Sequence, residues 1–162
     1  MIASIKNFLT PSQCEYFMKL YEDNLNDSFL IKDKFYSFFA INLIKLNIPF
    51  EDIEPRLKGS YYEDRLRVQS IPSNFEVNEN YHIHINCSSF SIFLNDDYEG
   101  GELEFENGDI YKPEQGLLVK FHQNDAHRVN PVTSGNRLTL VGLLDSDNTN
   151  DIIGFPITKK II

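Results

Sequence analysis

The sequence of 162 residues contains no tryptophan and only two cysteines, Cys14 and Cys87. Two cysteines so far apart exclude a disulfide framework and the usual cysteine-based metal sites. We therefore expect both to be reduced thiols in a protein of the cytoplasm. The sequence also lacks an apolar run long enough for a leader peptide or a membrane-spanning helix, so no membrane association is predicted.

Positive charge is scarce as well: 15 Lys and Arg stand against 24 Asp and Glu, giving a formal net charge of −9 at pH 7. Nucleic-acid binding depends on lysine and arginine that neutralise phosphates, so no nucleic-acid partner is expected. No linker, repeat or low-complexity tract interrupts the chain. The length then fits one domain over residues 1–162.

Aromatic residues are abundant, with 13 Phe and 8 Tyr, and this favours strands over a helical bundle. The second half alternates short apolar runs with turn residues. The Gly100-Gly101 pair suits a turn with positive φ, and Asn107-Gly108 is typical of a hairpin turn. We predict a loop at 131–135 and strands at Leu66–Ile71, Ser89–Leu94, Glu102–Glu106, Asp109–Tyr111, Leu117–Phe121 and Leu138–Leu144.

Two helices are predicted in the first part of the chain. Thr10 suits the N-cap of the first, followed by Pro11 and by Gln13 at the capping-box position, and this helix should reach about Leu25. The second is predicted over Lys34–Leu46, with a Phe-rich face in the core. Residues 2–8 are typical of an edge strand and residues 51–64 of an irregular segment.

The order of elements favours residues 1–65 as helical support and residues 66–147 as a strand-rich core. Many short strands behind two helices indicate a mainly β protein, either a sandwich or a barrel. The pattern alone does not distinguish between these architectures.

Histidines mark the candidate site. His82, His84 and Asn86 alternate, so on a strand their side chains share one face. His127 follows about forty residues later, between two further strand-like runs. Two imidazoles on one strand and one from a distant strand can bind a metal ion and leave positions open for substrate. His122 is interpreted as a solvated surface residue.

Arg137 lies ten residues after His127, at the start of the last long predicted strand. An arginine buried on a strand requires an anionic partner, because its desolvation is otherwise uncompensated. Thr139 shares its face and can add a hydroxyl group. A structural ion pair with one of the many carboxylates is the alternative interpretation of this arginine.

Three motifs carry a family resemblance: LNDDYEGGEL at 94–103, PEQG at 113–116 and HRVNPVTSGNR at 127–137. The region 74–144 resembles the prolyl 4-hydroxylase-like branch of the 2-oxoglutarate- and Fe(II)-dependent oxygenases. The resemblance implies a double-stranded β-helix (jelly roll) with N-terminal helical support. It also implies Fe(II) as cofactor, 2-oxoglutarate as co-substrate, and hydroxylation of a C–H bond. A prolyl residue of a protein is the first substrate hypothesis, and small molecules remain open.

The first metal-binding strand departs from the H-x-D motif of that family. If His84 is the first ligand, Asn86 occupies the aspartate position, and an amide oxygen is a weak ligand for Fe(II). If His82 is the first ligand, His84 replaces the aspartate and a site of three histidines results with His127. Ligand strength favours His82, His84 and His127, while the set with Asn86 remains open.

The resemblance assigns Arg137 to the distal carboxylate of 2-oxoglutarate, with Thr139 beside it. The tyrosine that the family carries on a neighbouring strand is Phe93 here, and Ser91 is predicted to replace part of its hydrogen bonding. Two other functions remain open: a three-histidine dioxygenase that does not use 2-oxoglutarate, and a jelly-roll binding module that has lost its iron.

Overall fold

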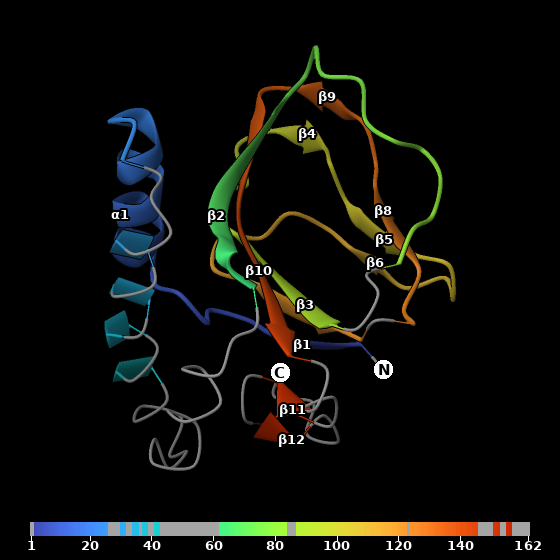
Figure 1. Cartoon of the computed structure of the whole chain (residues 1–162). Coiled ribbons are helices and arrows are strands. Elements are labelled where there is room, and N and C mark those ends of the chain that lie inside the picture. The colour runs from blue at the N-terminus through green and yellow to red at the C-terminus, as the bar shows by residue number, and fades with distance from the viewer. Residues whose placement is uncertain are drawn as a thin grey trace.

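The computed structural model describes residues 2–25, 62–83, 87–122 and 124–145, with helical pieces at 30–31, 34–35, 37–38 and 41–42 and strand pieces at 151–152 and 155–156. Strands dominate these ranges and lie in two facing layers, with helix α1 (Pro11–Glu22) outside the larger one (Figure 1). The mainly β fold class predicted from the sequence is therefore confirmed.

The larger sheet is antiparallel and contains five strands in the order β1-β7-β3-β10-β2. Their bounds are β1 Ala3–Ile5, β7 Leu118–Phe121, β3 Cys87–Phe93, β10 Asn136–Asp145 and β2 Tyr62–Pro72. Strand β1 lies at an edge, as predicted. Strand β2 begins at Tyr62, so the prediction of irregular structure was wrong for 62–64. Pairing with β10 as far as Leu143 extends this strand beyond its apolar pattern.

The smaller layer is built from shorter strands: β6 Ile110–Tyr111, β5 Leu103–Phe105 and β8 His127–Val129, with a separate pair of β4 Glu99–Gly100 and β9 Val132–Ser134. The β5–β6 hairpin confirms the predicted turn, in which Gly108 has a φ of 96°. The loop predicted at 131–135 was wrong. Val132 is buried against Ile71 and Tyr98, and this tertiary contact stabilises strand β9. The polar residues Thr133 and Ser134 do not indicate a strand by themselves. Two short strands, β11 Asp151–Ile152 and β12 Phe155–Pro156, pair with each other.

The predicted N-terminal capping of α1 is confirmed. The Thr10 hydroxyl accepts a hydrogen bond from the Gln13 backbone N–H at 3.3 Å, and the Gln13 side chain accepts one from the Thr10 N–H at 3.0 Å. The helix ends at Glu22 instead of continuing to Leu25, because the chain turns at Asn24 with a φ of 56°. No helix among the described residues is long and apolar enough to cross a membrane.

A second helical segment is confirmed, but it begins earlier than predicted. The described residues between Leu30 and Asn42 are helical, and the rest of the predicted range lies outside the described residues. Its Phe35 is buried and stacks on Phe90 of β3 at 5.6 Å between ring centroids. Ile41 is exposed, so the apolar character of this segment overstates its burial.

Cys14 is a buried free thiol on α1. Burial raises the pKa of this thiol to about 12, so it remains protonated at neutral pH and behaves as a small apolar core residue. The side chain of Cys87 lies outside the described residues.

The two-residue period of the strands separates two environments. One face of the larger sheet packs against the helices through leucines such as Leu138 and Leu140. The other face looks into the space between the sheets, where Phe93, Val119 and Phe121 pack with Leu103 and Phe105 of β5. Polar residues that alternate with the first set therefore enter this inner space.

Candidate active site

His82 and His127 are directly opposite each other on neighbouring strands. Each backbone N–H donates to the carbonyl of the other residue, at 2.9 and 3.0 Å, and the two ring centroids are 4.4 Å apart. Such a directly paired set has its side chains on the same face. His84 and Asn86 lie outside the described residues, within which no group of three metal-ligating side chains occurs. The structure thus brings two predicted ligands together and does not locate the third.

The ring of His127 is held in a defined orientation. Its Nδ1 lies 2.9 Å from the carbonyl oxygen of Asp125, and because a carbonyl can only accept, Nδ1 donates this hydrogen bond. The lone pair of the neutral imidazole then lies on Nε2, which is the atom available to a metal ion. The ring also lies 4.3 Å from that of Phe121, and the residue is 4 % exposed.

A cavity of about 230 Å³ lies beside these histidines, between the two sheets. Among the described residues it is lined by His82, His127, Arg137, Ser91 and Ser89, further by Arg67, Gln69, Phe90, Phe121 and Gly142, and by the apolar Ile71, Leu103, Val129 and Val141. No Asp or Glu occurs in this set. Predicted metal ligands and the predicted co-substrate arginine thus share one cavity.

Arg137 is a buried cation, 1 % exposed, without a carboxylate partner among the described residues. Its Nε donates to the Gly101 carbonyl at 2.9 Å, one terminal nitrogen donates to the Thr139 hydroxyl at 3.2 Å, and the guanidinium lies over the Phe93 ring. Burial lowers its pKa, an effect opposed by Tyr98. These contacts leave further N–H donors for an anion, which the buried charge requires.

Gly101 allows this close approach. A Cβ atom at position 101 would lie 2.9 Å from Cδ of Arg137, and the φ of 68° is unfavourable for other residues. Thr139 is fully buried beside Arg137 and does not line the cavity, so its hydroxyl supports the arginine.

Two serines of β3 add unpaired polar atoms to the cavity wall. Ser91 and Ser89 are 5 % and 4 % exposed, and neither hydroxyl has a hydrogen-bond partner among the described residues. Buried polar groups are rarely left unpaired, so these hydroxyls fit contact with a polar ligand. His122, in contrast, is half-buried, accepts from the Asn124 backbone N–H at 3.3 Å and does not line the cavity.

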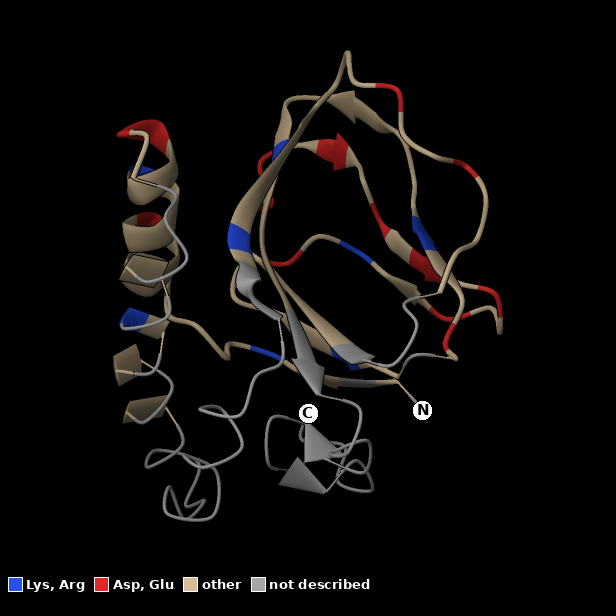
Figure 2. Cartoon of the chain, in the orientation of Figure 1, with Lys and Arg blue, Asp and Glu red and all other residues tan. Residues whose placement is uncertain are grey.

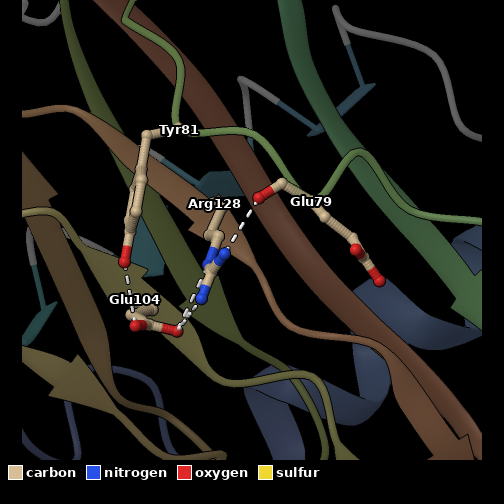
Figure 3. Close-up of polar contacts among 4 residues, drawn as sticks. All are labelled: Glu79, Tyr81, Glu104 and Arg128. Carbon is tan, nitrogen blue, oxygen red and sulfur yellow. Dashed lines mark hydrogen bonds and ion pairs between the residues drawn. The ribbon is translucent and has the colours of Figure 1, made fainter.

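The sequence did not indicate a cluster formed by Tyr81, Glu104 and Arg128 (Figure 3). The Tyr81 hydroxyl donates to one oxygen of Glu104 at 2.9 Å, while Nε and Nη2 of Arg128 donate to the other at 3.3 and 3.1 Å. Arg128 also donates to the Glu79 carbonyl and lies 4.6 Å from the centre of the Tyr81 ring. The hydrogen bonds from Tyr81 and Arg128 lower the pKa of Glu104.

Tyr81 and Arg128 are the chain neighbours of His82 and His127, so alternation places this cluster on the face opposite the histidines. Its bonds join the His82 segment to β8 and β5 directly behind the candidate metal site. The sequence positions of Tyr81 and Arg128 next to the two histidines could have indicated the cluster. Glu104, however, is distant in the chain and pairs with Arg128 only through the sheet register.

We predict that Arg128→Met weakens metal binding by about 10- to 100-fold, the usual effect of losing a supporting contact behind a metal ligand. The reason is that His82 loses its fixed position beside His127. Calorimetric titration of the purified protein with Co²⁺ measures this change. Lys19→Met is the matched control, because it removes the exposed ion pair with Asp23 on α1 and should leave the affinity unchanged. Equal affinities of both variants would contradict the prediction.

Comparison with known proteins supports the same family. Residues 73–144 match the model of the 2OG-Fe(II) oxygenase superfamily. A PKHD-type hydroxylase of Picosynechococcus sp. is 46% identical over 63 residues, covering 36% of this chain and 29% of the relative. Another, of Gloeothece citriformis, is 28% identical and covers 90% of this chain and 79% of the relative. The chain thus spans less than a third of the first relative and about four fifths of the second.

Solved structures agree in fold. A viral collagen prolyl hydroxylase of Paramecium Bursaria Chlorella virus-1, in complex with 2OG, has a TM-score of 0.55 at 14% identity, covering 90% of this chain and 95% of its own. A prolyl 4-hydroxylase of Phytophthora capsici has a TM-score of 0.61 at 14% identity, covering 91% and 60%. The predicted jelly roll is confirmed.

Fe(II) and 2-oxoglutarate, the cofactor and co-substrate of this family, fit the residues present. Two imidazoles lie side by side, one with its lone pair on Nε2, and a buried cation with unused donors lines the same cavity. Residues 73–144 thus match the 2OG-Fe(II) oxygenase superfamily, and the similar proteins and the fold support a prolyl 4-hydroxylase-like oxygenase.

Proposed function

We propose that the protein is an Fe(II)- and 2-oxoglutarate-dependent hydroxylase that acts on a C–H bond of its substrate. One observation carries the proposal: His82, His127 and the buried cation Arg137, which has no carboxylate partner among the described residues, line one cavity. A metal site without the arginine would fit many enzymes, and a buried arginine alone would fit a structural role. Their combination is what a site for a metal ion and a dicarboxylate requires.

Different side chains bind the metal and the co-substrate. His84 and His127 hold the iron together with His82 or Asn86, and the Asp125 carbonyl orients His127 for this role. Arg137 binds the distal carboxylate of 2-oxoglutarate, and the Gly101 carbonyl and the Thr139 hydroxyl hold its guanidinium in place.

Other groups complete the site. Ser91 offers its unpaired hydroxyl to the co-substrate, in place of the hydroxyl that Phe93 lacks. Phe121 and Leu103 line the cavity and exclude water from the reacting centre. When bound, Fe(II) and 2-oxoglutarate supply the oxidation, in which O₂ is consumed, 2-oxoglutarate becomes succinate and CO₂, and the substrate gains a hydroxyl group.

The identity of the substrate is also a proposal. A prolyl residue of a protein is the first candidate, supported by the name of the viral collagen prolyl hydroxylase that shares the fold. A free amino acid or another small molecule is the second. A three-histidine dioxygenase without 2-oxoglutarate is less well supported, because it leaves Arg137 without an anion. The neutral Asn86 keeps a binding module without iron as the other alternative.

Release of succinate tests the proposed activity. The wild type, Asn86→Asp and His84→Asp are loaded with Fe(II) under argon and then exposed to air with 2-oxoglutarate. If His84 is the first ligand, Asn86→Asp restores a carboxylate ligand and should raise succinate formation above that of the wild type. If His82 is the first ligand, Asn86→Asp should change little and His84→Asp should retain activity. Bound iron without succinate in all three proteins would contradict the hydroxylase and favour the binding module.

A further inference from the structure

A second arginine lines the same cavity. Arg67 of β2 is exposed there, beside Gln69, and has no ion pair or hydrogen bond with the described residues. Its partner in the sheet is Val141, which pairs with Ser91 on its other side, whereas Arg137 pairs with Ile71. Four residues along β10 separate the two arginine positions, a distance of about 13 Å at the rise of a strand.

The charge of the cavity contrasts with that of the protein. The chain carries a net charge of −9, and Figure 2 shows Asp and Glu along the loops and strands of the smaller sheet. The described residues that line the cavity nevertheless include two arginines and no carboxylate. Such local separation of charge favours anionic ligands within the cavity.

Binding of the metal and co-substrate does not remove the excess of positive charge in the cavity. Fe(II) carries two positive charges and 2-oxoglutarate two negative charges, and the candidate ligands His82, His84, Asn86 and His127 are all neutral. Both arginine charges then remain uncompensated by the protein residues described here. With the 2-oxoglutarate carboxylate at Arg137, the guanidinium of Arg67 still has no anionic partner within the described part of the chain.

We propose that Arg67 binds a carboxylate of the substrate, so that the enzyme selects substrates with an acidic group near the carbon it hydroxylates. This inference rests on the proposed function and names its substrate class. A guanidinium binds a carboxylate through two parallel hydrogen bonds, which fixes orientation as well as position. Gln69 and the unpaired hydroxyl of Ser89 lie on the same cavity wall and supply further polar contacts.

This carboxylate has two chemical sources: an Asp or Glu side chain beside a prolyl residue of a peptide, or the carboxylate of a free amino acid. The probes are therefore matched pairs of acid and amide. We choose tripeptides acetylated at the N-terminus and amidated at the C-terminus, Ala-Pro-Asp with Ala-Pro-Asn and Asp-Pro-Ala with Asn-Pro-Ala, and free L-proline with L-prolinamide. Their binding to the protein loaded with Mn²⁺ and 2-oxoglutarate is measured by calorimetry under argon, where no turnover occurs.

The acid of at least one pair should bind about tenfold or more tightly than its amide, as expected for a charged pair in a partly enclosed site. Arg67→Gln should remove this preference and leave the affinity for 2-oxoglutarate unchanged. Arg67→Glu should reverse it, and Lys19→Gln on α1 should have no effect. The peptide pairs and the proline pair distinguish the two sources of the carboxylate.

Three results would overturn the proposal: no acid preference in any pair, a preference that persists in Arg67→Gln, or a loss of 2-oxoglutarate affinity in Arg67→Gln. The last result would assign Arg67 to the co-substrate. Failure of the proposed oxygenase activity is separate, because it appears as absent succinate release in air while the acid preference under argon remains.

Discussion

Replacing His127 with alanine is expected to abolish tight binding of Fe(II). His127 lines the cavity, and the hydrogen bond of its Nδ1 to the Asp125 carbonyl leaves the Nε2 lone pair for a metal ion. Among the described histidines, His82 lies beside it. Loss of a direct ligand should cost more than the roughly 10- to 100-fold caused by losing a supporting contact. Iron content after anaerobic loading and gel filtration measures the effect.

The same measurement decides between the two ligand sets. His84→Ala should lose iron in either set, His82→Ala only if three histidines bind the metal, and Asn86→Ala only if the amide is a ligand. His122→Ala is the control histidine, because His122 does not line the cavity. Full iron occupancy in both His84→Ala and His127→Ala, with the fold intact, would refute the metal assignment.

Replacing Arg137 with methionine is expected to weaken 2-oxoglutarate binding by about 2–5 kcal/mol, the range for removing one partner of a buried charge pair. The distal carboxylate would then enter the buried site without the guanidinium that pairs with it. Calorimetric titration of the Mn²⁺-loaded protein under argon measures the affinity. Arg137→Lys should recover only part of it, because an ammonium group lacks the two parallel donors of a guanidinium.

The free energy of unfolding should not fall in Arg137→Met, although 2-oxoglutarate affinity does. This difference separates a binding role of Arg137 from a structural one. In the ligand-free protein Arg137 is a buried charge without a carboxylate partner among the described residues, so Arg137→Met should leave the free energy of unfolding unchanged or raise it. Urea unfolding without ligand checks this. Lost stability together with unchanged 2-oxoglutarate affinity would make Arg137 a structural residue.

The local patterns of the sequence accounted for much of the fold. Thr10, Pro11 and Gln13 cap a helix through contacts within a few residues, and Asn107-Gly108 forms its turn in the same way. Strand alternation placed Thr139 on the face of Arg137, because this period depends on backbone geometry alone. The role of Ser91 followed from the family resemblance. The likeness of residues 127–137 to a known motif predicted from the sequence that His127 and Arg137 belong to one site.

The features that the sequence did not indicate depend on distant contacts. Strand β9 forms because Val132 packs against Ile71 and Tyr98. The Tyr81–Glu104–Arg128 cluster requires the register that pairs β5 with β8, and no residue in it is unusual by itself. Arg67 was an ordinary charged residue in a predicted strand until the cavity and its neighbours were known. Register and packing, unlike turn chemistry, are set by the whole fold.

The most direct test of iron and 2-oxoglutarate in one cavity is the visible absorption that develops when a 2-keto acid chelates Fe(II). Under argon, 2-oxoglutarate is titrated into the Fe(II)-loaded wild type, with His127→Ala and Arg137→Met alongside. We predict a band that saturates at one equivalent in the wild type, is absent in His127→Ala and requires far more 2-oxoglutarate in Arg137→Met. A folded wild-type protein that retains iron but shows no band at saturating 2-oxoglutarate would contradict this account.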